Sequence, residues 1–141
     1  LSFGAFQGCS RLPSVTIHRA GNIGYKAFAG CSSLGSIVLL GSDNEHIGNE
    51  AFVDCDNLKW LVLPHYASYM RDRVQNGTLF RRHAFRGINS SVVIFLSELC
   101  VFDKSYLVQH GLNSDCRVIK LSQQLYNLIG AHQPKVELCN S

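Results

Sequence analysis

Residues 23–39 read Ile-Gly-Tyr-Lys-Ala-Phe-Ala-Gly-Cys-Ser-Ser-Leu-Gly-Ser-Ile-Val-Leu, and the same pattern occurs before and after them. It consists of Ala-Phe, two residues, Cys, two residues, Leu, two residues, and two aliphatic residues separated by one. The Ala-Phe pairs begin at residues 5, 27 and 51, so the spacing is 22 and then 24 residues. Spacings of this size are typical of a solenoid, in which each short unit buries its apolar residues by stacking on its neighbours.

Alternating aliphatic residues predict short parallel strands, each with one buried face. The fifth strand is placed by the likeness of residues 118–122 to residues 93–97, at a spacing of 25. We expect six strands, near residues 15–17, 37–39, 61–63, 93–96, 118–121 and 136–138.

Parallel strands require a connection on the far side of each turn. In the regular repeats the Ile-Gly-x-x-Ala-Phe stretch predicts a single helical turn there. In the later repeats the pattern predicts a helix within residues 65–82, with Asn76-Gly77 as its stop, and helices over residues 105–110 and 122–132. For the last helix we expect Ser122 as the N-cap and one apolar stripe of Leu125, Leu128 and Ile129.

Two parts of the chain differ in regularity. We predict regular repeats over residues 1–64, and degenerate repeats with a helical insertion and a C-terminal cap of the same solenoid over residues 65–141. The alternative is that the second part is a separate small domain. Leu1 aligns with a position inside the repeat, so we expect the chain to be the C-terminal piece of a longer array, or one trimmed to its ordered part.

Composition indicates an ordered protein, with 46% hydrophobic and 16% charged residues. No apolar run approaches the roughly 18 residues of a membrane helix, so no membrane span is predicted. Of six cysteines, Cys9, Cys31 and Cys55 share one repeat position, which favours a ladder of buried structural thiols over a disulfide or metal role. No Cys-x-x-Cys pair exists, and no metal site is predicted.

The repeat unit, quoted at residues 23–34 and again at residues 47–58, resembles the BspA-like (Treponema pallidum-type) leucine-rich repeat. The resemblance is specific over residues 1–64, partial over 84–96, and limited to the strands beyond. It implies an α/β fold, a curved right-handed solenoid with a parallel sheet on its concave face. It also implies a surface or secreted protein that acts in adhesion and protein binding and is not an enzyme.

The residues that point outward from the predicted strands form the first candidate binding site, because side chains alternate along a strand. The outward-pointing residues in the middle of the predicted sheet are apolar, and an exposed apolar patch is typical of an interaction site. One of them is Trp60, and Trp is the residue type most often found as an interface anchor. The predicted binding residues are Thr16, Val38, Leu40, Trp60, Val62, Val93, Phe95 and Lys120. The alternatives are that another domain or a second copy covers this patch, or that the register is shifted by one residue.

A second candidate site is a basic stretch. Five arginines and one aspartate fall within residues 65–90, and this segment accounts for the net charge of +3. The basic patch consists of Arg71, Arg73, Arg81, Arg82 and Arg86. It suits an acidic protein, a phosphate or a nucleic acid, or it is the solvated face of a helix. A pI of about 8.6 is too mild to predict nucleic acid as the partner.

Catalytic patterns are weak. Cys100, Cys116 and His110 are candidates for a thiol–imidazole pair, but the sequence supplies no orienting third group or oxyanion site. We therefore predict a non-catalytic interaction module without a cofactor, with a protein as its partner. The alternative function is an intracellular scaffold or effector with a separate functional domain in residues 65–141. The sequence predicts neither the partner's identity nor the oligomeric state.

Overall fold

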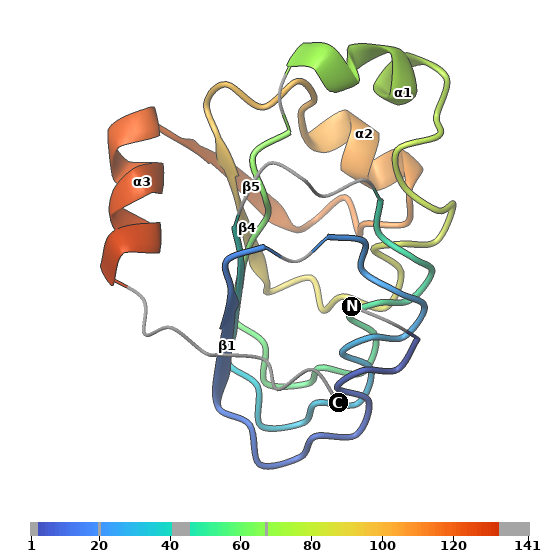
Figure 1. Cartoon of the computed structure of the whole chain (residues 1–141). Helices are drawn as coiled ribbons and strands as arrows, with labels where there is room; N and C mark the ends of the chain where they lie inside the picture. Colours follow the sequence, from blue (N-terminus) through green and yellow to red (C-terminus); the bar gives the residue numbers. More distant parts are fainter. Residues whose placement is uncertain (1–2, 20, 41–45, 67, 133–141) are drawn as a thin grey trace.

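Five parallel strands form one sheet in chain order in the computed structural model, which describes residues 3–19, 21–40, 46–66 and 68–132 (Figure 1). The strands are β1 (Ser14–Ile17), β2 (Ser36–Leu39), β3 (Trp60–Val62), β4 (Val93–Ser97) and β5 (Arg117–Leu121). The parallel arrangement and the first five predicted strands are confirmed. The sixth predicted strand lies outside the described residues.

The main core lies on one side of this sheet and runs the length of the stack. It contains the paired aliphatic residues that the repeat places in or next to β1 to β4, namely Val15, Ile17, Ile37, Leu39, Leu61, Leu63, Ile94 and Leu96. Behind them the phenylalanines of successive repeats stack face to face, with ring centroids 5.3 Å apart for Phe6 and Phe28, 5.8 Å for Phe28 and Phe52, and 6.2 Å for Phe52 and Phe85. Each repeat therefore buries its phenylalanine mainly against its neighbours, which is why one unit alone does not make a core.

The repeated cysteine position is structural in the described residues. The Cys31 thiol donates to the Phe6 carbonyl and the Cys55 thiol donates to the Phe28 carbonyl, each at 3.1 Å. The neighbouring Cys31 thiol and burial raise the pKa of Cys55. In the part of the chain that the structure describes, the five cysteines 9, 31, 55, 100 and 116 are all free thiols.

The connections opposite the sheet are hydrogen-bonded turns instead of the predicted helical turn. Lys26 and Glu50 occupy the same repeat position, and both have a φ of 53°. This left-handed conformation interrupts a right-handed helical turn, which explains why the prediction was wrong. The turns also bond from repeat to repeat, since the Phe28 N–H donates to the Ala51 carbonyl at 2.8 Å.

The helices are shorter than the sequence predicts in one place and match it in two. Within residues 65–82 the helix is shorter than predicted, because a 3₁₀ turn at Ser68–Met70 leads into α1 (Arg71–Gln75). The predicted stop at Asn76-Gly77 is confirmed, since Asn76 is the C-cap of α1 and Gly77 has a φ of 69°. The chain then turns inward and buries Phe80. The other helices are α2 (Lys104–Gln109) and α3 (Gln123–His132).

Candidate interaction surface

The side of the sheet opposite the main core, here called the outer face, carries the predicted binding residues of β1 to β4. The strand register aligns them in rows across the sheet. The first row, here called the Trp60 row, consists of Ser14, Ser36, Trp60, Val93 and Arg117. The second row consists of Thr16, Val38, Val62, Phe95 and Ile119.

Helix α3 packs on the outer face, on the side of the sheet away from the connecting turns (Figure 1). Its Tyr126 is buried in a second apolar cluster with Val38, Leu40 and Val62, which Ile129 joins from the same helix. Three of the predicted binding residues are buried in this cluster, namely Val38, Leu40 and Val62, and Thr16 is buried on the same face. Part of the predicted apolar patch is thus covered from within the chain.

Polar contacts fix α3 in this position. The Tyr126 hydroxyl donates to the Leu63 carbonyl at 2.6 Å, and burial raises the pKa of this phenol. The Ser97 hydroxyl donates to Gln123 Oε1 at 2.9 Å. Ser122 caps the helix as predicted, since its hydroxyl accepts from the Leu125 N–H at 3.2 Å.

The predicted apolar stripe of α3 is wrong in part. Tyr126 and Ile129 contact the sheet, whereas Leu125 and Leu128 are 53% and 50% exposed. Positions 126 and 129 lie three residues apart and share one helical face. A tyrosine with a buried hydroxyl therefore takes the place that the pattern assigned to leucines.

The Trp60 row lies beside the part of the outer face that α3 covers, and it remains accessible. The Trp60 side chain is 40% exposed, and its indole lies edge-on to the Phe95 ring at a centroid distance of 6.1 Å. Val93 and Phe95 are half-buried, and Arg117 is exposed. The row thus combines an oriented aromatic residue with a cation on one face of the sheet.

The predicted position of Lys120 on this surface is wrong, because β5 is shifted by one residue from the sequence alignment. Ile94 pairs with Val118 and Phe95 pairs with Ile119, a spacing of 24 instead of 25. Val118 therefore packs toward the main core. Arg117 and Ile119 take the outer positions, and the sequence analysis missed both.

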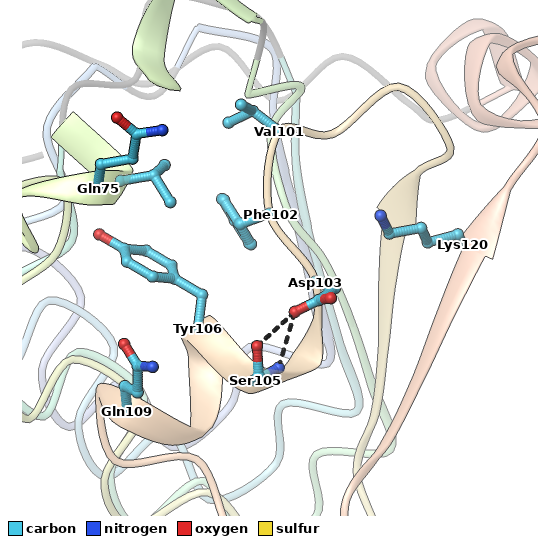
Figure 2. Close-up of a pocket in the computed structure, with 9 residues that line it drawn as sticks. Gln75, Val101, Phe102, Asp103, Ser105, Tyr106, Gln109 and Lys120 are labelled. Atoms are coloured by element: carbon cyan, nitrogen blue, oxygen red, sulfur yellow. Dashed lines mark hydrogen bonds between the residues drawn. The ribbon is translucent and has the colours of Figure 1, made fainter. Parts of the chain in front are cut away.

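Lys120 instead borders a hollow of about 450 Å³ at the end of the stack (Figure 2). Figure 2 shows Lys120 on β5 and, across the hollow, Gln75, Tyr106 and Gln109. Asp103 in this hollow caps α2: its carboxylate accepts from the Ser105 hydroxyl at 2.6 Å and the Ser105 N–H at 3.1 Å. The hydrogen bond from the Ser105 hydroxyl lowers the pKa of Asp103, so the carboxylate serves the helix start.

The thiol and imidazole groups weighed for catalysis have structural surroundings. His110 Nδ1 lies 2.8 Å from the Tyr106 carbonyl, and its ring packs on Tyr106 at 4.4 Å. Burial raises the pKa of both Cys100 and Cys116, which disfavours the nucleophilic thiolate. Within the described ranges, no group of three or more His, Cys, Asp or Glu side chains is arranged to hold a metal ion.

The basic patch divides into two parts. Arg73, Arg81 and Arg82 line one pocket of about 460 Å³, together with His46. Arg71 and Arg86 are exposed and do not line it.

The stacked phenylalanines and the carbonyl-bonded thiols recur at the same position of each regular repeat. A family model for the BspA-type leucine-rich repeat region, with six copies, matches residues 1–92. The chain belongs to the BspA-type leucine-rich repeat family. Comparison with curated proteins and with solved structures gave no significant match.

In this BspA-type protein the family and the parallel sheet agree on a leucine-rich-repeat-like α/β fold. Leucine-rich repeats generally act as protein-interaction modules without catalytic activity. In the part of the chain that the structure describes, none of the helices is long and apolar enough to cross a bilayer.

Proposed function

We propose that this protein is a non-catalytic protein-binding module whose contact surface is the Trp60 row. The observation that carries the proposal is the position of Trp60, which is half-exposed on a sheet and oriented by Phe95. Preorganised aromatic residues lose little conformational entropy on binding and are the commonest interface hot spots. The partner expected to fit is a protein surface with an apolar pocket for the indole.

The side chains beside Trp60 indicate which chemical groups the partner surface should carry. Arg117 supplies a cation at one end of the row, and Ser14 and Ser36 supply hydroxyl groups at the other. Apolar anchors with a polar rim are the usual anatomy of an interface. We expect a partner carboxylate opposite Arg117, because Arg binds carboxylates with two parallel hydrogen bonds.

The shape and setting of the module follow from the same proposal. We infer that the repeats wind as a right-handed solenoid with the outer face on its concave side, and that residues 65–141 continue the stack as degenerate repeats. Parallel strands in chain order, all connected on one side of the sheet, support this inference. The family resemblance favours an adhesin-like role at a cell surface.

The test is an affinity pull-down with the full chain, Trp60→Ala and Phe95→Ala, beside Tyr69→Ala as a control. Tyr69 is 70% exposed on the 3₁₀ turn before α1, away from the Trp60 row. We expect proteins retained by wild type and by Tyr69→Ala to be lost with Trp60→Ala. Equal capture by wild type and Trp60→Ala would place the contact surface elsewhere.

A further inference from the structure

The pocket lined by three members of the basic patch, here called the arginine pocket, is separate from the Trp60 row. It measures about 460 Å³ and lies where α1 ends and the chain turns back into the core. Its lining residues are His46, Arg73, Gly77, Thr78, Phe80, Arg81 and Arg82. We propose that the arginine pocket binds the compact dianion of a phosphate monoester.

Backbone hydrogen bonds hold the two sides of the pocket together. The Thr78 N–H donates to the Arg73 carbonyl at 2.9 Å, and Arg73 Nη2 lies 3.4 Å from the Thr78 carbonyl. The Arg81 N–H donates to the Ile47 carbonyl at 3.0 Å, which joins this segment to an earlier repeat. The backbone at Arg73 and at Arg81 is thus fixed by hydrogen bonds.

The pocket also has a rigid apolar wall. Phe80 is 3% exposed, and its ring lies edge-on to Phe85 at 5.1 Å, at the end of the phenylalanine stack. An apolar wall beside guanidinium groups lowers the local dielectric, which strengthens their attraction for an anion. Arg81 and Arg82 are exposed, so their donors are accessible to a ligand, whereas Arg73 is half-buried and donates through Nη2 to the Thr78 carbonyl.

Among the described lining residues of the pocket, the charged side chains are three arginines. No carboxylate is among its described lining residues, and Asp72, the sequence neighbour of Arg73, does not line it. Three guanidinium groups around one volume repel each other, and a bound dianion relieves this repulsion. Guanidinium groups also match phosphate oxygens with paired hydrogen bonds, which a halide ion does not allow.

A compact anion fits better than an extended polyanion. Nucleic-acid binding requires a continuous basic stripe that follows many phosphates. Here Arg71 and Arg86 do not line the pocket, and the net charge of the chain is only +3. A phosphate monoester, either on a protein side chain or on a small molecule, has the required charge, and the pocket of about 460 Å³ also has room for the group that carries the phosphate.

The experiment is a titration of the full chain at constant ionic strength, followed by ¹H–¹⁵N chemical shifts, with O-phosphoserine, inorganic phosphate, a phosphoserine-containing peptide and a single-stranded oligonucleotide. We expect saturable shifts around residues 73–82 with phosphoserine. Arg81→Gln and Arg82→Gln should each weaken binding about tenfold, because each removes charge-assisted hydrogen bonds. Arg71→Gln and Arg86→Gln remove the same charge outside the pocket and should change the affinity less than about twofold.

The same titration distinguishes a free phosphate compound from a phosphorylated protein as the ligand. Equal affinity for phosphoserine and inorganic phosphate would support a site for the free dianion, and tighter binding of the phosphopeptide would support a phosphorylated protein. The proposal is overturned if Arg71→Gln weakens binding as much as Arg81→Gln, if the oligonucleotide binds more tightly than phosphoserine, or if no shift saturates. Trp60→Ala should bind phosphoserine like wild type, so the outcome is independent of the protein-binding surface.

Discussion

The Tyr126 hydroxyl donates a hydrogen bond of 2.6 Å to the carbonyl of Leu63, across 63 residues of sequence. This contact joins α3 to the end of β3 and places a phenol ring over the apolar centre of the outer face. It places part of the predicted binding patch in a second core and leaves the Trp60 row at the edge of that core.

Replacing Tyr126 with Phe should therefore destabilise the protein, because the buried Leu63 carbonyl loses its donor. We expect a loss of about 1–2 kcal/mol in the free energy of unfolding. Urea denaturation followed by circular dichroism measures it. Tyr25→Phe, at an exposed position, should change stability by less than about 0.5 kcal/mol. A Tyr126→Phe variant as stable as wild type would show that the contact does not hold α3.

Trp60 and Phe52 are both aromatic residues of the repeats, but only one belongs to the core. Phe52 is 1% exposed and packs between two other phenylalanine rings, so Phe52→Ala should cost about 3–5 kcal/mol. Trp60→Ala should cost less than about 1.5 kcal/mol, chiefly the loss of its edge contact with Phe95. Thermal unfolding of both variants checks the difference. A loss at Trp60 as large as that at Phe52 would assign Trp60 to the core.

Gly48 is required by the close approach of two repeats. A Cβ atom added there would lie 2.7 Å from the Tyr25 nitrogen and 2.8 Å from the Gly24 carbonyl carbon. Both atoms are backbone and cannot move independently of the stack, so Gly48→Ala should cost about 1–3 kcal/mol. At Gly35 the nearest atom to an added Cβ is 3.7 Å away, and Gly35→Ala serves as the matched control. Equal melting temperatures for the two variants would contradict this account.

Stability should fall at alkaline pH. Burial raises the pKa of Tyr66 and of Tyr126, whereas a phenol in the unfolded chain ionises near pH 10. Above that pH the unfolded state binds fewer protons than the folded state, so the free energy of unfolding decreases as pH rises. Each such tyrosine lowers the free energy of unfolding by about 1.4 kcal/mol for each pH unit above 10, until the folded protein also ionises. Below pH 10 its effect on stability does not change with pH.

Urea midpoints between pH 8 and pH 11 measure this slope. Burial also raises the pKa of Tyr106. Tyr126→Phe removes one of these three phenols and should give a shallower decline than wild type. Parallel curves for the two proteins would show that Tyr126 does not titrate in this coupled way.

The repeated part of the fold could be predicted from the sequence because its signals agree with one another. The repeated apolar residues are buried in the main core, as in the second repeat with Ala27, Phe28, Cys31 and Leu34. The repeat therefore predicts the strands, the register of β1 to β4 and the thiol positions. It does not predict the turns opposite the sheet, since nothing in Lys26 or Glu50 signals a positive φ.

The register of β5 was not predictable from its pattern. Residues 118–121 offer two alternations, Val118 with Lys120 and Ile119 with Leu121, and sequence likeness to β4 favours the wrong one. The observed register places Lys120 toward the main-core side, but the lysine stays exposed at the hollow and avoids the cost of a buried charge. A strand whose two faces are similar specifies its register weakly.

The packing of α3 on the outer face could not be predicted from local sequence either. Helical periodicity indicates an apolar stripe on α3 but does not say which element it meets. The contact from Tyr126 to Leu63 is a long-range one, and no short motif records it. The candidate site was therefore predicted as a whole face, and tertiary packing reduces it to one row.

The five members of the Trp60 row differ chemically, with two serines, a tryptophan, a valine and an arginine, although the strands beneath them are nearly uniform. Substitutions along this row leave the buried scaffold intact. On the proposed function, binding preference can diversify one repeat at a time, and grafting a different set of five side chains should change which partner is bound at little cost in stability.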